Sequence, residues 1–210
     1  DVGANIGLLS LEIAKTANGG IYCFEPNPYT FSKLVEFVGL NNKNKDFKFV
    51  CAAVGEKSGF TDFYVSERDY LGVMSSQVNT DPSAKLIKVP VISLDDYFDG
   101  KTIKIDFIKI DVEGAELFVL KGAEKILKED SPMLLIEIHG PFLHRFGYTV
   151  SDFFEYVYGL GYKSYNILTS QLLTPEDFIK NSGKYVLNPI SGEDMSNLGY
   201  GSVLFKFNEN

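Results

Sequence analysis

The hydrophobic positions along the chain switch repeatedly between the spacing of a helix and the continuous runs of a buried strand. From residue 6 to residue 17, one helical stripe carries the apolar side chains Ile6, Leu9, Ile13, Ala14 and Ala17. Asn18-Gly19-Gly20 should end that helix, and residues 21–24 then form a short apolar run typical of a strand. Asn27-Pro28 supplies a capping residue followed by proline at the first helical position, which predicts a second helix.

The alternation continues to the end of the chain. Further strands are expected at residues 47–54, 106–111, 133–138, 163–168 and 202–207, and further helices at 114–128, 149–160 and from 174. Residues 60–65 and 86–92 also have strand patterns and flank a polar stretch. We expect a β-rich insertion between the third and fourth strands, whose loop is either a lid or a surface excursion. Strands and helices in this order predict an α/β fold with a doubly wound, mostly parallel sheet.

The length of the chain suits one domain. Its 210 residues, 45% of them hydrophobic, are enough for a single cooperative core, so we expect one domain over residues 1–210. The sequence begins at Asp1 inside a glycine loop, and such a loop normally follows a buried strand. We therefore expect the first strand to lie upstream of Asp1.

The charge pattern limits the kinds of partner that we expect this protein to bind. The formal net charge is −8, and the Lys and Arg residues are scattered singly, which argues against a nucleic-acid surface. No apolar run approaches the roughly 18 residues that span a bilayer, so we expect no membrane partner and a cytoplasmic protein. A small-molecule partner is favoured.

Two features suggest a nucleotide-type ligand. Asp1-x-Gly3-x-x-x-Gly7 leaves backbone amides exposed at the start of a helix, where a polar or anionic group can bind, although a purely structural turn has the same pattern. Glu25 ends the second strand 18 positions after Gly7, where a carboxylate can accept both hydroxyls of a ribose. The alternative is an acidic residue that merely stabilises a helix N-terminus.

Five ordered motifs resemble the FkbM family of S-adenosylmethionine (SAM)-dependent methyltransferases. They are Asp1-Val-Gly-Ala-Asn-Ile-Gly7, Phe24-Glu-Pro-Asn-Pro28, Ala52-Ala-Val-Gly55, Ile108-Lys-Ile-Asp-Val-Glu-Gly-Ala-Glu116 and Leu135-Ile-Glu-Ile-His139. The resemblance covers residues 1 to about 140. It implies the Rossmann-like class I methyltransferase fold, SAM as the cofactor, and methylation of a hydroxyl on a sugar or another small metabolite.

The resemblance also implies roles for individual residues. The methionine part of SAM would be surrounded by Asp1, Gly3, Asn5 and Gly7. Glu25 would bind the ribose, with Pro26 beside it among the cofactor-binding residues. Ala52 and Ala53 would lie at the adenine edge.

Methyl transfer to a hydroxyl also requires a group that removes the hydroxyl proton. His139 is our first choice, because it lies at a strand end and its ordinary pKa suits proton transfer near neutral pH. Asp111 and Glu137 end the same two strands and are predicted to join it, with Asp111 also able to orient the cofactor amine. Glu113 and Glu116 are equally well explained as helix-capping residues.

Asp111, Glu137 and His139 could also converge on a divalent cation. Their spacing is not specific for a metal, so none is predicted. Two other functions stay open: a catalytically silent SAM-binding or scaffold domain, and a nicotinamide-dependent oxidoreductase. The second is disfavoured because the first glycine loop lacks the dinucleotide spacing.

Overall fold

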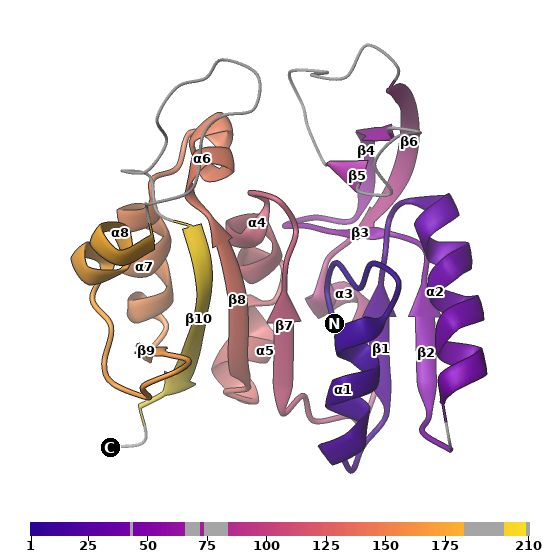
Figure 1. The fold of residues 1–210 in the computed structure, drawn as a ribbon, viewed down its shortest axis with the longest axis horizontal. Coiled ribbons are helices and arrows are strands. Elements are labelled where there is room, and N and C mark those ends of the chain that lie inside the picture. Colours follow the sequence, from indigo (N-terminus) through magenta and orange to yellow (C-terminus); the bar gives the residue numbers. More distant parts are fainter. Residues whose placement is uncertain (43, 66–71, 74–83, 183–199, 209–210) are drawn as a thin grey trace.

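The computed structural model describes residues 1–42, 44–65, 72–73, 84–182 and 200–208 (Figure 1). Its helices are α1 (Leu8–Thr16), α2 (Pro28–Asn41), α3 (Leu94–Phe98), α4 (Glu116–Lys121), α5 (Glu124–Glu129), α6 (Gly140–Leu143), α7 (Val150–Gly159) and α8 (Pro175–Ser182), with the 3-10 turn η1 (His144–Phe146). Its strands are β1 (Ile21–Phe24), β2 (Phe47–Val50), β3 (Ala53–Val54), β4 (Gly59–Val65), β5 (Gly72–Val73), β6 (Lys85–Ile92), β7 (Phe107–Ile110), β8 (Met133–His139), β9 (Tyr162–Asn166) and β10 (Tyr200–Phe207). The α/β class predicted from the sequence is confirmed.

The strands form a mixed rather than a mostly parallel arrangement. β1 pairs with β2 and β7 pairs with β8, both in parallel, as the pattern predicted. In the order β7-β8-β10-β9, however, β10 is antiparallel to both of its neighbours. After β8 the chain passes through α7 to β9, which does not pair directly with β8. Strand β10 lies between β8 and β9 and runs antiparallel to both. This reversed strand is where the prediction of a mostly parallel sheet was wrong.

Two predicted elements are interrupted in the structure. The strand expected at 47–54 divides at Cys51-Ala52, because β2 pairs with β1 whereas β3 pairs with β6. The helix expected at 114–128 divides at Gly122, where a side chain would overlap the carbonyl oxygen of Gly55. Backbone contact with a distant segment, rather than local propensity, decides both breaks. The short helices α3 and α6 and the turn η1 were not predicted.

The two helix caps that the sequence indicated are present. The Asn27 side chain accepts hydrogen bonds from the backbone N–H groups of Tyr29 and Thr30 at the start of α2. Thr149 and Asp152 form the reciprocal capping box at the start of α7. These local signals fix where both helices begin.

The β-rich insertion is also present. β4 and β6 form an antiparallel pair, and they assemble with two short strands in the order β3-β6-β4-β5. In Figure 1 this sheet stands above β1, β2 and α2. The proposed lid loop falls mainly on residues 66–71 and 74–83, which lie outside the described residues.

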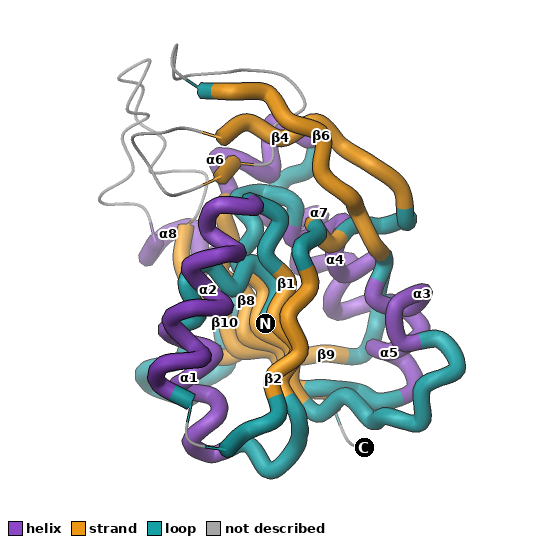
Figure 2. Tube along the Cα trace, turned by 90° about the vertical axis from the view of Figure 1, so that its right-hand side faces the viewer, coloured by secondary structure: helices purple, strands orange, loops and turns teal. Residues whose placement is uncertain are grey.

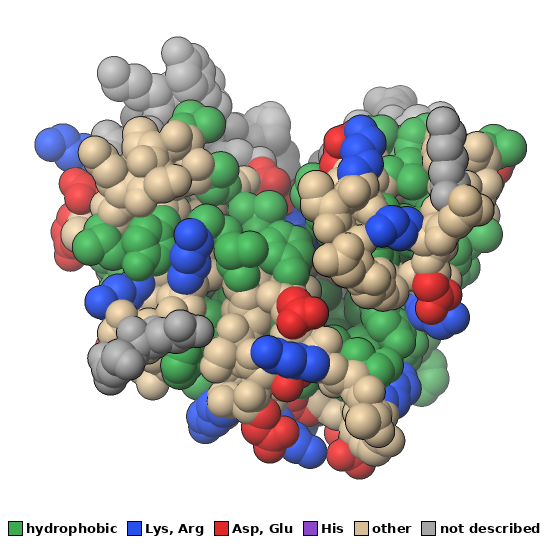
Figure 3. All heavy atoms as spheres, turned by 90° about the horizontal axis from the view of Figure 1, so that it is seen from below, with side chains coloured by type: hydrophobic (Ala, Val, Ile, Leu, Met, Phe, Trp, Pro, Cys, Tyr) green, Lys and Arg blue, Asp and Glu red, His purple; other side chains and the backbone are tan. Residues whose placement is uncertain are grey.

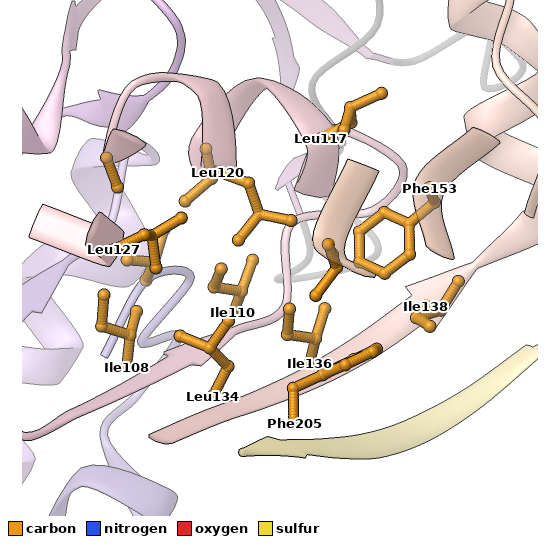
Figure 4. Packing of buried hydrophobic residues seen from close by; sticks show 14 of the residues in the cluster. Ile108, Ile110, Leu117, Leu120, Leu127, Leu134, Ile136, Ile138, Phe153 and Phe205 are labelled. Atoms are coloured by element: carbon orange, nitrogen blue, oxygen red, sulfur yellow. The ribbon is translucent and has the colours of Figure 1, made fainter. Parts of the chain in front are cut away.

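The main core lies on one face of β7, β8 and β10. Figure 2 shows α1 and α2 on one side of the strands and α3, α4 and α5 on the other. Figure 4 shows Ile110, Ile136 and Phe205 pointing from their strands towards the helical side chains Leu120 and Phe153, and all five are at most 1% exposed. Burial of this size contributes about 1.5–3 kcal/mol for each large apolar side chain. This packing holds in place the ends of β7 and β8, where the candidate site lies.

Figure 3 shows the charged side chains on one face of the molecule. On the face drawn in Figure 3, acidic and basic side chains are interspersed and form no basic patch. Among the described residues, no helix has the length and apolar character needed to cross a bilayer.

Candidate active site

The glycine loop is shaped by contact with two strand ends. Gly3 has φ +74°, and a side chain there would overlap the backbone carbonyl oxygen of Asp111. The N–H groups of Gly3 and Ala4 both donate to the carbonyl oxygen of Phe24, each at 3.0 Å. Only glycine combines this left-handed conformation with such close backbone approach. The loop is therefore fixed between the end of β1 and the end of β7.

Glu25 follows β1 and is held by backbone donors. Its Oε2 accepts from the N–H of Asn5 at 3.0 Å, and its Oε1 accepts from the N–H of Asn27 at 2.9 Å. Burial raises the pKa of Glu25, and these two hydrogen bonds oppose the rise. Each carboxylate oxygen keeps further acceptor capacity, so a hydroxylated ligand can still bind to it.

A cavity of about 660 Å³, including space open to solvent, lies against Glu25. We call it the Glu25 cavity. The predicted cofactor residues that line it are Gly3, Asn5, Glu25, Pro26, Ala52, Ala53 and Asp111. Residues from four separate segments of the sequence thus converge on one cavity.

Asp1 and Gly7, the other two predicted cofactor residues, do not line this cavity. The Asp1 carboxylate is buried beside the loop, where it accepts a hydrogen bond from the Ser10 hydroxyl. Gly7 has φ +86°, and a side chain there would meet Leu34 and Val38 of α2 at 2.6 Å. Both residues therefore support the loop through contacts outside the Glu25 cavity.

Lys109 is a support that the sequence analysis missed. Its ammonium donates to the carbonyl oxygen of Gly3 at 2.7 Å and lies 3.1 Å from Asp1 Oδ1 and 3.5 Å from Asp111 Oδ2. Burial lowers the pKa of Lys109, and the nearby Asp111 carboxylate opposes that effect. The sequence did carry a signal for this role, which is the presence of a lysine within the short apolar strand β7. A buried lysine needs partners for its charge.

Beyond Asp111, several charged groups meet at the ends of β7 and β8. His139 Nε2 lies 3.9 Å from Asp111 Oδ1 and 3.4 Å from Glu113 Oε2. One candidate ligand atom from each of Asp111, Glu137 and His139 lies within 4.8 Å of the other two. We call these four residues and Glu116, which is described next, the rim cluster. Its members are Asp111, Glu113, Glu116, Glu137 and His139. Parallel strands bring their carboxyl ends to one edge, which is why residues 26 positions apart meet.

Glu116 sits beneath the rim and orients the histidine. Its side chain is fully buried, and its Oε1 lies 2.7 Å from His139 Nδ1 and accepts from the N–H of Gly114 at 3.0 Å. Because Nδ1 faces a carboxylate, Nδ1 carries the hydrogen of the neutral ring. Nε2 is on the other side of the ring, where it faces Asp111 and Glu113. Glu116 lies in the first turn of α4 and accepts from a backbone N–H there, which agrees with the capping interpretation, but nothing in the sequence indicated its contact with His139.

The same carboxylates change the acidity of the ring. Burial lowers the pKa of His139, but the hydrogen bond to Glu116 and the charges of Glu113, Glu116 and Asp111 outweigh burial and raise the pKa to about 9. At neutral pH the ring is then mostly protonated in the ligand-free protein. A protonated imidazole cannot accept the proton of a hydroxyl.

A second cavity, of about 870 Å³ including open space, lies on the α1 side of the strands. We call it the Leu135 cavity, after a side chain in its lining. Asp111 lines both cavities, and Glu137 lines this one. The rim cluster is therefore reached from two directions.

The other lining residues of the Glu25 cavity were not assigned to it from the sequence, and they include Phe63 and Glu113. Phe63 comes from β4 of the insertion, and no local pattern indicated that this strand contributes to the site. Glu113 lies in the turn after β7, and it has φ +54°, which is unusual for a residue other than glycine. Burial raises the pKa of Glu113, while the nearby His139 opposes the rise.

The fold is α/β, and it places the Glu25 cavity at strand ends, where proteins of this class usually bind their ligands. A family model described as the methyltransferase FkbM domain matches residues 1–164. The chain therefore belongs to the FkbM methyltransferase family, as the five motifs predicted.

Individual relatives agree with this assignment. The hexuronic acid methyltransferase AglP of Haloferax volcanii is 31% identical over 140 residues, which are 66% of this chain and 54% of AglP. Methyltransferase 1 of Beauveria bassiana is 30% identical over 142 residues, or 59% of this chain and 57% of that protein. The chain thus spans about half the length of the curated relatives it matches.

A solved structure also has a similar fold. The FkbM methyltransferase of Methylobacillus flagellatus KT superposes with a TM-score of 0.56 at 20% identity, covering 99% of this chain and 42% of the other. At this identity the likeness supports the fold only.

Proposed function

We propose that this chain binds SAM in the Glu25 cavity and transfers its methyl group to a hydroxyl of a sugar-like acceptor. The observation that carries the proposal is the Glu25 carboxylate, which is buried, held by two backbone N–H groups and part of the cavity lining. The relative AglP, named for hexuronic acid, supports a sugar as the acceptor. We also propose that β1–β2 and β7–β8 belong to a Rossmann-like, doubly wound sheet, because Val2 forms parallel bridges to both Phe24 and Ile110.

The residues of the Glu25 cavity fit the cofactor. SAM would supply a methyl group carried by a positively charged sulfur. An acceptor oxygen would attack the methyl carbon in line, and the carbon–sulfur bond would break with its electron pair going to the sulfur. Glu25 offers acceptor oxygens for two ribose hydroxyls, and Ala52 and Ala53 offer a small apolar wall for a flat base. Gly3 lines the same cavity, and its left-handed backbone, which the missing side chain permits, sets the path of the loop beside the ligand space.

The rim cluster is where the acceptor proton would go. Asp111 lines the Glu25 cavity and faces His139, so a hydroxyl aligned with the methyl group lies within reach of both. His139 stays the candidate base, with Asp111 and Glu137 as its catalytic neighbours. In that role the ring has to be neutral, and the pKa of about 9 limits the neutral fraction near pH 7. A carboxylate acceptor, by contrast, needs no base.

Binding and turnover test the two halves of the proposal. Titration calorimetry of the purified protein with S-adenosylhomocysteine should show one site, and Glu25→Gln should weaken binding by about 10- to 100-fold through the loss of hydrogen bonds to a charged acceptor. Glu36→Gln, on the exposed face of α2, is the matched control and should bind as wild type. No binding by the wild-type protein would overturn the cofactor assignment.

The acceptor is tested with SAM and glycans that contain hexuronic acid, next to matched neutral glycans. Mass spectrometry should find added methyl groups, and alkali should leave them in place, because methyl ethers resist saponification whereas methyl esters do not. Alkali-labile methyl groups would overturn the hydroxyl as target and leave the methyltransferase assignment intact. No methyl transfer to any glycan would contradict the sugar-like acceptor.

A further inference from the structure

The rim cluster has the composition and geometry of a cation site. Its candidate ligand atoms, one each from Asp111, Glu137 and His139, lie within 4.8 Å of one another. Two ligands of one ion are separated by at most twice the bond length, roughly 4.2 Å for Mg²⁺ and 4.6–5.2 Å for Ca²⁺. The group is therefore already close to the required size, and a smaller ion needs only a slight approach of the two carboxylates.

The histidine is held as a metal-binding histidine is held. Metal-ligating imidazoles almost always donate their second ring N–H to a carboxylate, which fixes the tautomer and the direction of the free nitrogen. Glu116 provides that carboxylate at 2.7 Å from His139 Nδ1, and both side chains are at least 98% buried. Nε2, the nitrogen that would ligate, lies on the side of Asp111 and Glu113.

The charge balance of the cluster favours a cation. Four carboxylates surround one imidazole, and Lys109 Nζ lies 3.5 Å from Asp111 Oδ2, whereas Asp111 Oδ1 faces the histidine. Glu116 adds a second, independent observation, because its Oε2 is buried and has no hydrogen-bond partner among the described residues. A protonated His139 and Lys109 offset only part of the negative charge of the four carboxylates, so a bound cation would stabilise the cluster.

From these observations we propose that Asp111, Glu137 and His139 bind a divalent cation of the Mn²⁺ or Mg²⁺ type, with Glu116 as the residue that positions His139. One imidazole with two carboxylates suits Mn²⁺ particularly well, since oxygen ligands favour Mn²⁺ and Mg²⁺ and imidazole favours transition metals. His139 is then a ligand rather than the base. The sequence predicted no metal, because the three ligands lie on two strands and have no characteristic spacing.

The site deepens the proposed methyl transfer and rests on it for its purpose. Asp111 lines both cavities and Glu137 lines the Leu135 cavity, so open coordination positions would face the space available to an acceptor. A hydroxyl oxygen bound there loses its proton at a lower pH, because the cation stabilises the alkoxide. The proton would leave to solvent or to a neighbouring carboxylate. The oxygen would keep the electron pair that forms the new bond to carbon, while the carbon–sulfur bond breaks and S-adenosylhomocysteine takes its electron pair.

The test uses Mn²⁺ as the probe and does not depend on activity. Chelator-treated protein is titrated with Mn²⁺, and the free ion is followed by its electron paramagnetic resonance signal. Wild type should bind one Mn²⁺, Glu137→Gln should weaken binding at least tenfold, and Glu116→Gln should weaken it by about 10- to 100-fold. Glu129→Gln, exposed at the end of α5, should bind as wild type. Circular dichroism shows whether each variant is folded.

The outcomes separate this proposal from the proposed function. No Mn²⁺ binding at millimolar concentration, or unchanged binding by folded Glu137→Gln, overturns the cation site. Full methyl transfer in excess chelator overturns its catalytic purpose and leaves the methyltransferase intact. Failure of S-adenosylhomocysteine to bind overturns the proposed function, whatever the Mn²⁺ titration shows.

Discussion

The Glu25 cavity and the rim cluster share Asp111, but they are built in different ways. Around the Glu25 cavity the backbone does most of the positioning: two N–H groups hold Glu25, and the carbonyl oxygen of Gly3 holds Lys109. In the rim cluster, side chains position one another, with Glu116 under His139. A site set by backbone geometry tolerates few changes in shape, whereas a site set by opposed charges responds to each ion and proton it binds.

The largest effect should come from Gly3→Ala, which disturbs the backbone on which the Glu25 cavity is built. The added methyl group would overlap the Asp111 carbonyl oxygen, and the left-handed φ adds strain. Since the obstacle is backbone rather than a flexible side chain, we expect a loss of about 3–5 kcal/mol in the free energy of unfolding. Urea denaturation measures it.

Gly39→Ala is the matched control for that change. Gly39 lies on the exposed face of α2, and no atom lies within 4 Å of the position that an added Cβ would take. Alanine should therefore stabilise the protein by about 0.5–1 kcal/mol. If Gly3→Ala is as stable as wild type and still binds S-adenosylhomocysteine, the loop is not the rigid element described above.

An intermediate effect is expected for Lys109→Met, because Lys109 supports both sites. The change leaves the Asp1 carboxylate buried without its cation and removes a donor from Gly3, which should cost about 3 kcal/mol of unfolding free energy. The exposed pair of Lys125 and Asp99 provides the contrast, since Lys125→Met should change stability by less than about 0.5 kcal/mol. Equal losses in thermal and urea unfolding for both variants would contradict the structural role of Lys109.

The sequence predicted the backbone-built site far better than the side-chain-built one. Glycine spacing and an acidic strand end are local patterns, and the structure brings Gly3, Asn5 and Glu25 to one cavity as expected. The role of Glu116 depends on a histidine 23 residues away, so the sequence indicated nothing more specific than a helix cap.

The same distinction between local and distant contacts separates the features of the fold that were predicted from those that were missed. Helix caps at Asn27 and Thr149 were predicted correctly, because a cap is a contact within four residues. The break at Gly122 and the reversed strand β10 were missed, because each depends on a partner that is distant in sequence. Phe63 reaches the Glu25 cavity only through the packing of the insertion, for which the chain carries no local signal.

The smallest expected effect is a pH dependence that belongs to the backbone-built site alone. Because burial raises the pKa of Glu25, this carboxyl takes up a proton at a higher pH than an exposed glutamate. Only the ionised form accepts two ribose hydroxyls, so affinity for S-adenosylhomocysteine should be constant above that raised pKa. Below it, the affinity should fall by up to about tenfold for each pH unit.

Calorimetric titrations between pH 7.5 and pH 5 measure this slope, with circular dichroism confirming that the protein stays folded. Glu25→Gln cannot ionise, so its weaker binding should be independent of pH across the same range. The difference between the two profiles removes contributions from Asp111 and from the rim cluster, since both remain in the variant. Parallel profiles for wild type and Glu25→Gln would show that another group controls binding, and the contrast between the two sites would then lose its electrostatic basis.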